Sequence, residues 1–237
     1  DDRHIVRRMI LKKTIFGVDK NPMAVELAKT ALWLHTFTVG APLSLLDHHL
    51  KTGDSLHGER LAQVQQGLQH LGALLLQSEF DRLALAGAQI AQVADLTDVD
   101  IAEATLSRQL ALDAGAKMAP ILSVLDFWRA LRWLVPGWPV ASAAQLQRLL
   151  AGDAPRTQAL RSALQHLLSP GVNLAQVLAA GTAGTKGAGA QEANALIAEA
   201  RALARRETFF HWWTQFPTVF GGAGKGARDA GFDAVIG

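Results

Sequence analysis

The stretch Thr14-Ile15-Phe16-Gly17-Val18-Asp19-Lys20-Asn21-Pro22 decides the fold that this sequence predicts. Its first part, Thr14 to Val18, is a β-rich apolar run that is typical of a buried strand ending at Asp19. Asn21 and Pro22 then begin a helix in the preferred way, with Asn as the N-cap and Pro at the first helical position. A strand followed directly by a helix is the unit from which α/β folds are built.

The residues on either side extend this unit into an α/β pattern. Residues 3–13 are expected to form a short basic helix, and the helix that begins at Pro22 continues toward Thr36. Its apolar side is expected to carry Val25, Ala28, Leu32 and Leu34. A second strand is expected from His49 to Thr52, ending on Gly53-Asp54-Ser55-Leu56. The order helix, strand, helix, strand predicts a parallel, doubly wound sheet.

From about Gly58 to Glu207 the sequence changes to a helical pattern. Ala, Leu and Gln dominate, and the apolar residues recur at the spacing of a helix face. One such face is formed by Leu61, Val64, Leu68, Leu71 and Leu75, and another by Ile121, Val124, Leu125, Trp128, Leu131 and Val135. Helix breaks are expected where Pro and Gly gather, at 136–139, 152–155, 169–171 and 181–190. The segment is predicted to be an all-α insertion.

After Glu207 the sequence is predicted to return to the sheet. Aromatic residues gather from Phe209 to Phe220, and we interpret His211, Trp212 and Trp213 as packing residues rather than a catalytic cluster. A glycine-rich loop and an apolar strand from Phe232 to Ile236 are expected to follow. The predicted organisation is therefore residues 1–57 as the first part of the sheet, 58–207 as the helical insertion and 208–237 as the return, with strands 14–18, 49–52 and 232–236 parallel and side by side.

Composition excludes several classes of protein. Hydrophobic residues make up 49% of the 237, which is ample for a core, and there is no cysteine for disulfides or thiolate metal sites. No apolar run reaches the ~18 residues of a membrane span, so we expect a cytoplasmic protein without membrane contact. The net charge of only +2 says little about DNA. Several basic residues can neutralise phosphates, although solvated helix faces explain them equally well: Arg7, Arg8, Lys12, Lys13, Arg201, Arg205 and Arg206.

Two carboxylates follow the predicted strands. In a doubly wound sheet, ligands bind across the carboxyl ends of the strands, where an acidic residue accepts hydrogen bonds from ribose hydroxyls, and Asp19 stands in such a position. Asp54 follows Gly53, which permits a turn close to a ligand, and its carboxylate can accept from an exocyclic amino group of adenine. Either residue alone is also consistent with an ordinary turn.

Two other patterns favour no site. His48 and His49 lack a third ligand at helical or hairpin spacing, so no metal site is predicted. The glycine-rich run Gly221 to Gly226 lacks the spacing that a phosphate-binding loop requires, and it is interpreted as a flexible loop.

The whole series of motifs resembles the adenine-specific (N6) DNA methylases of type IIG restriction-modification and related phage-defence systems. The motifs that carry the resemblance are residues 17–29, 51–56, Phe210-His211-Trp212, Phe216-Pro217, Val219-Phe220 and 231–237. The resemblance implies an α/β fold, an incomplete class I S-adenosylmethionine-dependent methyltransferase (Rossmann-like) sheet with a large all-α insertion. It implies S-adenosyl-L-methionine as the cofactor and double-stranded DNA as the partner of the full-length enzyme. The implied cofactor residues are Asp19, on the ribose, Asp54, on the adenine amino group, and their neighbours Lys20 and Ser55.

The resemblance also implies parts of the site that these 237 residues do not contain. A glycine-rich strand and turn are expected before residue 1, and an Asn-Pro-Pro-Tyr tetrapeptide is expected just after Gly237. The chain begins with Asp1-Asp2 rather than Met and stops directly after an apolar run. We therefore expect a piece of a longer enzyme that has no catalytic residue of its own, binds the cofactor weakly and is inactive by itself.

Two other functions remain open at this point. An acid at the end of the same strand also serves nicotinamide cofactors, so an oxidoreductase fragment is an alternative, although Gly53-Asp54-Ser55-Leu56 favours the methyltransferase. A non-enzymatic helical interaction module is the other alternative, and the Ala/Leu-rich middle of the chain motivates it.

Overall fold

The computed structural model describes residues 6–7, 10–11, 13–36, 43–71, 77–96, 101–220 and 231–236. The chain divides into two compact units. One, called the sheet unit, consists of residues 1–55, 82–118 and 212–237, and the other, called the helical unit, consists of residues 56–81 and 119–211. Residues 82–118, which the sequence pattern assigns to the insertion, thus belong with the sheet unit. Within the described part of the chain, no helix combines the length and apolarity of a membrane span.

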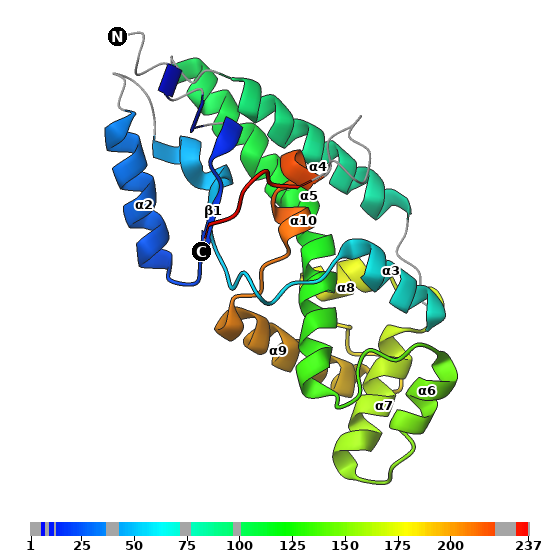
Figure 1. Cartoon of the computed structure of the whole chain (residues 1–237). Coiled ribbons are helices and arrows are strands. Elements are labelled where there is room, and N and C mark those ends of the chain that lie inside the picture. Colours follow the sequence, from blue (N-terminus) through cyan, green and yellow to red (C-terminus); the bar gives the residue numbers. More distant parts are fainter. Residues whose placement is uncertain are drawn as a thin grey trace. The chain divides into compact units, whose positions relative to one another are not determined.

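Two parallel strands form the sheet. Strand β1 (Gly17–Asp19) pairs with β2 (Leu50–Thr52) in the register Gly17 to Leu50 and Asp19 to Thr52. Helix α2 (Pro22–His35) and the 3-10 helix η1 (Leu43–His48) connect them, and Figure 1 shows α2 beside β1. The predicted parallel pairing of these two strands is confirmed. Strand β1 starts later than expected because Thr14 is still helical, with its hydroxyl donating to the carbonyl of Ile10 at 2.8 Å.

Helix α2 begins as predicted but buries a different face. The side chain of Asn21 accepts from the backbone N–H of Met23 at 2.9 Å, and Pro22 follows as the first helical residue. The buried positions are Val25 and Lys29, whereas Ala28 and Leu34, expected on the apolar side, are exposed. Val25 packs with Leu11, Leu46 and Leu50, and Leu32 and Trp33 pack against this cluster. The apolar stem of Lys29 covers the core while its ammonium pairs with Glu26 and Asp47, both at 2.8 Å.

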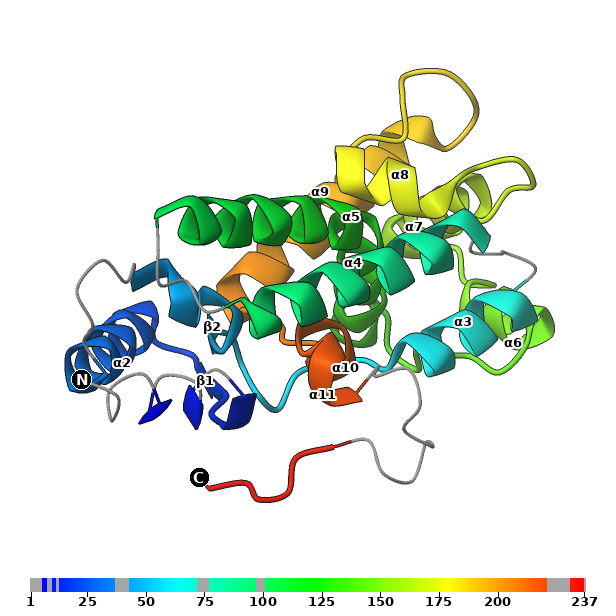
Figure 2. The same cartoon turned by 90° about the horizontal axis from the view of Figure 1, so that it is seen from above.

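The rest of the sheet unit is helical where the structure describes it. Helix α4 (Gln77–Asp95) lies along α5 (Ile101–Leu134), as Figures 1 and 2 show, and Gln89 joins their sheet-unit parts. The Gln89 amide donates to Asp113 at 2.6 Å and accepts from Lys117 at 3.0 Å. Two short helices, α10 (Trp212–Gln215) and α11 (Pro217–Phe220), complete the unit.

The predicted strand from Phe232 to Ile236 is wrong. These residues form bends and coil, and the sheet of the described residues contains only β1 and β2. Val235 and Ile236 are 79% and 97% exposed. An apolar run becomes a strand only when a neighbouring strand supplies hydrogen-bonding partners, and neither β1 nor β2 pairs with this one. Phe232 instead packs its ring against Phe16 and Phe216, with centroids 5.6 and 6.0 Å away.

The helical unit contains most, but not all, of the helices of the predicted helical segment. They are α3 (Leu61–His70), the second part of α5, α6 (Ala143–Leu149), α7 (Pro155–Leu167), α8 (Leu174–Ala180) and α9 (Ala190–Glu207). The predicted face of α5 is confirmed, since its six apolar residues, from Ile121 to Val135, are at most 4% exposed. On α3, Val64, Leu68 and the following Leu71 are buried, whereas Leu75 lies outside the described residues. Helix α7 packs against α9.

The predicted breaks coincide with helix ends. Pro155 begins α7, and Gly181 ends α8 in the left-handed conformation, with φ at 78°. The loop from Gly181 to Gly189, within the predicted break at 181–190, is tied to α9 by Asn194. The Asn194 side chain accepts from the N–H of Ala183 at 2.6 Å and donates to the carbonyl of Gly184 at 2.7 Å.

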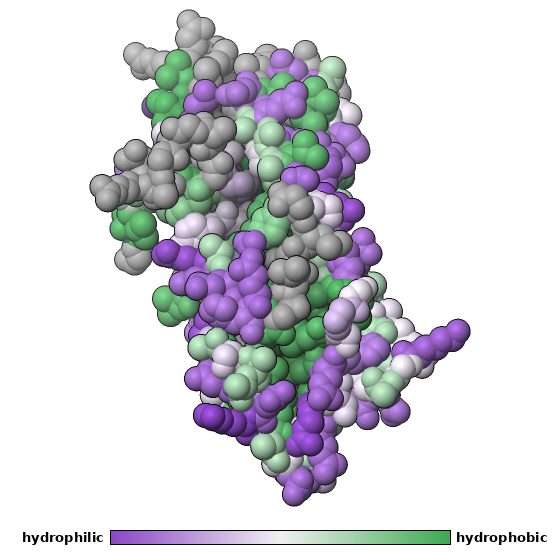
Figure 3. Space-filling view, turned by 90° about the vertical axis from the view of Figure 1, so that its right-hand side faces the viewer, coloured by the Kyte–Doolittle hydropathy of each residue, from purple (hydrophilic) through white to green (hydrophobic). Residues whose placement is uncertain are grey.

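Figure 3 shows apolar side chains gathered between hydrophilic ones on one face of the molecule.

Candidate functional site

The candidate site lies at the carboxyl ends of β1 and β2. Because the strands are parallel, their carboxyl ends meet at one edge of the sheet, which is where α/β sheets bind ligands. Asp19 is the last residue of β1, and its carbonyl accepts from the N–H of Gly53 at 2.9 Å. The turn that carries Asp54 and Ser55 therefore starts beside Asp19. The structure brings together the four residues that the sequence predicts, namely Asp19, Lys20, Asp54 and Ser55.

Asp19 is exposed and oriented by its own turn. Its Oδ1 accepts from the backbone N–H of Asn21 at 2.7 Å, while the side chain of Asn21 caps α2. A carboxylate accepts about four hydrogen bonds, so the bond from Asn21 leaves the Asp19 carboxylate free to accept from two hydroxyl donors. Asp19 can therefore both form the turn before α2 and accept hydrogen bonds from a ligand, since the turn fixes the carboxylate at the sheet edge.

Lys20 and Asp54 form an ion pair across this edge. Lys20 Nζ lies 3.0 Å from Asp54 Oδ2, and the side chain of Asp54 is only 14% exposed, against 53% for Lys20. A partly exposed pair contributes little to stability, about 0–1 kcal/mol. Its main consequence is orientation, because the ammonium fixes one oxygen of the Asp54 carboxylate.

Ser55 is held by a residue far along the chain. Its carbonyl accepts from the indole Nε1–H of Trp212 at 2.9 Å. The indole also contacts Phe216 and Phe232, with centroid distances of 5.8 and 5.7 Å. Trp212 thus packs as expected but also bonds to the candidate site, and no local sequence signal shows a hydrogen bond that spans 157 residues.

His211 is a buried structural residue, as the packing interpretation predicts. It is 1% exposed, its Nδ1 accepts from the N–H of Glu59 at 2.9 Å, and its Nε2 lies 3.0 Å from Asp126 Oδ1. Since Nδ1 is an acceptor here, the proton of the neutral ring is on Nε2 and is donated to Asp126.

Lys51, on β2, is a feature that the sequence analysis missed. Its Nζ donates to Gln215 Oε1 at 3.0 Å and lies 5.7 Å from the centroid of the Phe216 ring. Burial lowers the pKa of Lys51 from 10.5 to about 8, because desolvation penalises the ammonium; Asp47 opposes this effect and Lys29 adds to it.

The stability of the chain is expected to rise with pH because of Lys51. The pKa of this group is lower in the folded state, so the unfolded chain binds more protons between pH 8 and 10.5, and stability increases across that range. The gain is at most about 3 kcal/mol, at about 1.4 kcal/mol per tenfold change in proton affinity. Urea unfolding at pH 7.0 and at about pH 10 measures this gain in the free energy of unfolding. The chain has no Tyr or Cys that could titrate between these two pH values. A Lys51→Met variant should lose the rise, and an equal rise in that variant would contradict the assignment.

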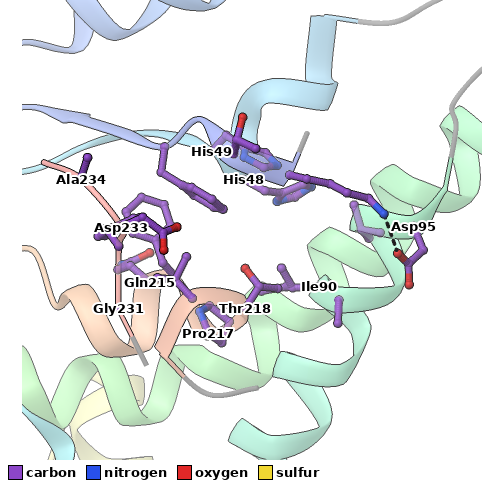
Figure 4. A pocket seen from close by; sticks show the side chains of 18 residues that line it. His48, His49, Ile90, Asp95, Gln215, Pro217, Thr218, Gly231, Asp233 and Ala234 are labelled. Atoms are coloured by element: carbon purple, nitrogen blue, oxygen red, sulfur yellow. Dashed lines mark ion pairs between the residues drawn. The ribbon is translucent and has the colours of Figure 1, made fainter. Parts of the chain in front are cut away.

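A separate cavity lies at the other end of the strands. It has a volume of about 590 Å³ and is bordered by residues that precede β1 and β2, including Phe16 and His49, and by α4, α10, α11 and residues 231–234. Figure 4 shows His48 and His49 along one wall, with Asp233, Gln215 and Thr218 on the others. None of the four candidate cofactor residues lines this cavity. The candidate site is therefore distinct from this cavity.

Two other patterns in the sequence are the pair His48-His49 and the glycine-rich run from Gly221 to Gly226. His49 Nδ1 bonds to the carbonyl of Ile15 at 2.9 Å, and within the described ranges no group of three His, Asp or Glu residues is placed to hold a metal ion. The run Gly221 to Gly226 lies outside the described residues.

Several of the basic residues considered for DNA contact are engaged within the chain. Lys13 pairs with Asp95 at 3.7 Å and Arg206 with Glu207 at 2.9 Å. Arg201 donates to the carbonyl of Ala179 at 2.7 Å. Arg7 and Arg205 are exposed, and Arg8 and Lys12 lie outside the described residues.

A parallel sheet with carboxylates at its carboxyl edge is typical of α/β proteins that bind nucleotide cofactors. The chain belongs to the Eco57I restriction-modification methylase family, whose family model matches residues 13–237. Membership implies a DNA methyltransferase of a restriction-modification system, and it favours this function over an oxidoreductase or a helical interaction module. The match includes the helical unit and, apart from residues 1–12, all three segments of the sheet unit. No curated protein and no solved structure matches the chain.

Proposed function

We propose that this chain is part of a DNA methyltransferase that transfers the methyl group of S-adenosyl-L-methionine to N6 of adenine in double-stranded DNA, in the cytoplasm, within a restriction-modification or phage-defence system. The observation that carries the proposal is the meeting of Asp19 and Asp54 at one carboxyl edge of a parallel sheet. In this proposal residues 1–57 and 208–237 belong to the catalytic part of the enzyme, and residues 58–207 are a helical insertion.

The chemistry of the edge fits an adenosine group. Asp19 is exposed and ionised carboxylates accept charge-assisted bonds from two hydroxyls at once, which suits the ribose. Asp54 lies next to Asp19 in a more enclosed position, which suits an amino group at the edge of the adenine ring. Lys20 orients Asp54, and Ser55 completes the turn beside it.

The remaining chemistry depends on residues outside this sequence. The cofactor, when bound, supplies an activated methyl group on its sulfonium. A target adenine must leave the DNA stack to reach it, and an Asn-Pro-Pro-Tyr tetrapeptide would hold that base by hydrogen bonds and stacking. The sequence contains no tyrosine, so this tetrapeptide is not among its 237 residues. We therefore expect the chain alone to bind the cofactor weakly and to transfer no methyl group.

Cofactor binding by the two carboxylates is directly testable on this chain. S-adenosylhomocysteine, used as a stable probe, should show saturation-transfer NMR signals from its adenine and ribose protons. Asp19→Asn should weaken the ribose signals and Asp54→Asn the adenine signals, with about tenfold lower affinity for each, because a charge-assisted hydrogen bond contributes about 1.5–3 kcal/mol.

The matched control for these variants is Asp153→Asn, an exposed carboxylate in the loop before α7 of the helical unit. It should leave the signals unchanged. Equal adenine and ribose NMR signals in all three variants would contradict the assignment of the cofactor site. The choice of base is tested separately by expressing the complete gene in a host without DNA methylation, where N6-methyladenine is expected and 5-methylcytosine would contradict the proposal.

A further inference from the structure

The short helix α10 contacts β2 and its turn on both sides of Asp54. Before the turn, Lys51 Nζ donates to Gln215 Oε1 at 3.0 Å. After the turn, the Ser55 carbonyl accepts from Trp212 Nε1 at 2.9 Å. Trp212 and Gln215 are the first and last residues of α10, and at a spacing of three they lie on the same side of the helix.

Helix α10 is itself fixed by packing. Phe216, which directly follows it, is 1% exposed and makes an edge-to-face contact with Phe16, the residue before β1, at 5.2 Å. The Trp212 ring packs against the same Phe216 at 5.8 Å. The hydrogen-bonding groups of Trp212 and Gln215 are thus held by a core that also includes Phe16, the residue before β1.

The geometry points to Trp212 and Gln215 as positioning residues that hold the Gly53–Ser55 turn so that Asp54 meets the adenine ring of the cofactor. The inference rests on the proposed function, because Asp54 is the adenine-binding group there. It goes further by giving the aromatic segment after residue 207 a role at the cofactor site. Neither residue touches the cofactor, and each acts through the turn.

The reason such support is needed lies in the size of the sheet. Strand β2 has three residues and pairs only with β1 among the described strands, so its own ladder constrains the following turn weakly. The bond from Gly53 N–H to Asp19 fixes the start of the turn, and the indole of Trp212 fixes its far side. Without the second contact, the far side of the turn loses one of its anchors, and the position of Asp54 is less closely fixed.

Trp212→Phe tests the inference because it keeps an aromatic ring in the packing and removes only the N–H donor. The backbone amides of Gly53, Asp54 and Ser55 should exchange with solvent about fivefold faster, the effect of losing one hydrogen bond of about 1 kcal/mol. The affinity for S-adenosylhomocysteine should fall by a similar factor, with the adenine NMR signals reduced and the ribose signals retained. Gln215→Met should act in the same direction.

Trp133→Phe, the same change on α5 in the helical unit, is the control and should leave both measurements unchanged. Unchanged amide exchange at residues 53–55 in Trp212→Phe would overturn the inference, whether or not the probe binds. Normal adenine signals in Trp212→Phe, with reduced ones in Asp54→Asn, would overturn it while leaving the proposed function intact. No effect of Asp54→Asn on the adenine signals, with faster exchange in Trp212→Phe, would show that Trp212 holds the turn but that the turn is not the adenine site. The proposed role of Asp54 would then fail, and with it the part of the inference that concerns the cofactor.

Discussion

Gly58→Ala is expected to destabilise the helical unit by about 3 kcal/mol, at the upper end of the cost of overpacking. A Cβ at this position would lie 2.1 Å from the carbonyl oxygen of Phe210 and 3.1 Å from its carbon. Both atoms belong to the backbone, so relief requires the two chain segments to separate. That separation would stretch the bond from Phe210 N–H to the carbonyl of His57, now 2.9 Å, and would move a ring that is 1% exposed.

Urea unfolding followed by tryptophan fluorescence measures this effect. The matched control is Gly115→Ala on α5, where a Cβ would meet nothing within 4 Å. That change should stabilise the chain by about 0.5–1 kcal/mol, since alanine is the better helix former. If Gly58→Ala unfolds at the same urea concentration as the unchanged chain, the close approach of residues 58 and 210 is not a feature of the folded protein.

Glu59→Ala is expected to lower the free energy of unfolding by about 3–5 kcal/mol, because it removes the carboxylate of a buried ion pair. The Glu59 side chain is 3% exposed. Its carboxylate accepts from Arg132 Nε at 2.5 Å and Nη2 at 3.2 Å, and Arg129 Nη1 lies 3.5 Å away. Alanine would leave the guanidinium groups of Arg129 and Arg132, whose side chains are 18% and 33% exposed, without their carboxylate.

Glu199→Ala is the control for this prediction. Glu199 pairs with Arg156 at a similar distance, 2.9 Å, but both side chains are well exposed, at 40% and 57%. Its removal should change the free energy of unfolding by no more than about 1 kcal/mol. Equal effects of the two variants in urea unfolding would show that the Glu59 pair is as well solvated as the Glu199 pair, contrary to its burial.

Features that depend on neighbouring residues were predictable from the sequence. The start of α2 follows from Asn21 and Pro22, since a cap is a bond between residues two or three apart. The buried face of α5 follows from its apolar period, because a helix repeats every 3.6 residues wherever it lies. The meeting of Asp19 and Asp54 follows from two parallel strands that each end in an acidic turn.

Features that depend on distant residues were not predictable in this way. The apolar run Phe232 to Ile236 has the composition of a strand, but only a hydrogen-bonding neighbour would make it one. On α2, the sequence offers Ala28 and Leu34 for burial, and packing against Leu11, Leu46 and Leu50 selects the face with Val25 and Lys29.

The sequence by itself therefore determined the local units of this protein: two strands, their connecting helix, the helical segment and the two carboxylates that identify the candidate cofactor site. Tertiary structure alone decided which groups support that site, including the indole of Trp212 on Ser55 and the amide of Gln215 on Lys51. The physical reason is the range of the interactions. Caps and helix periods are set within a few residues, whereas a hydrogen bond between residues more than 150 positions apart exists only after the whole unit has packed.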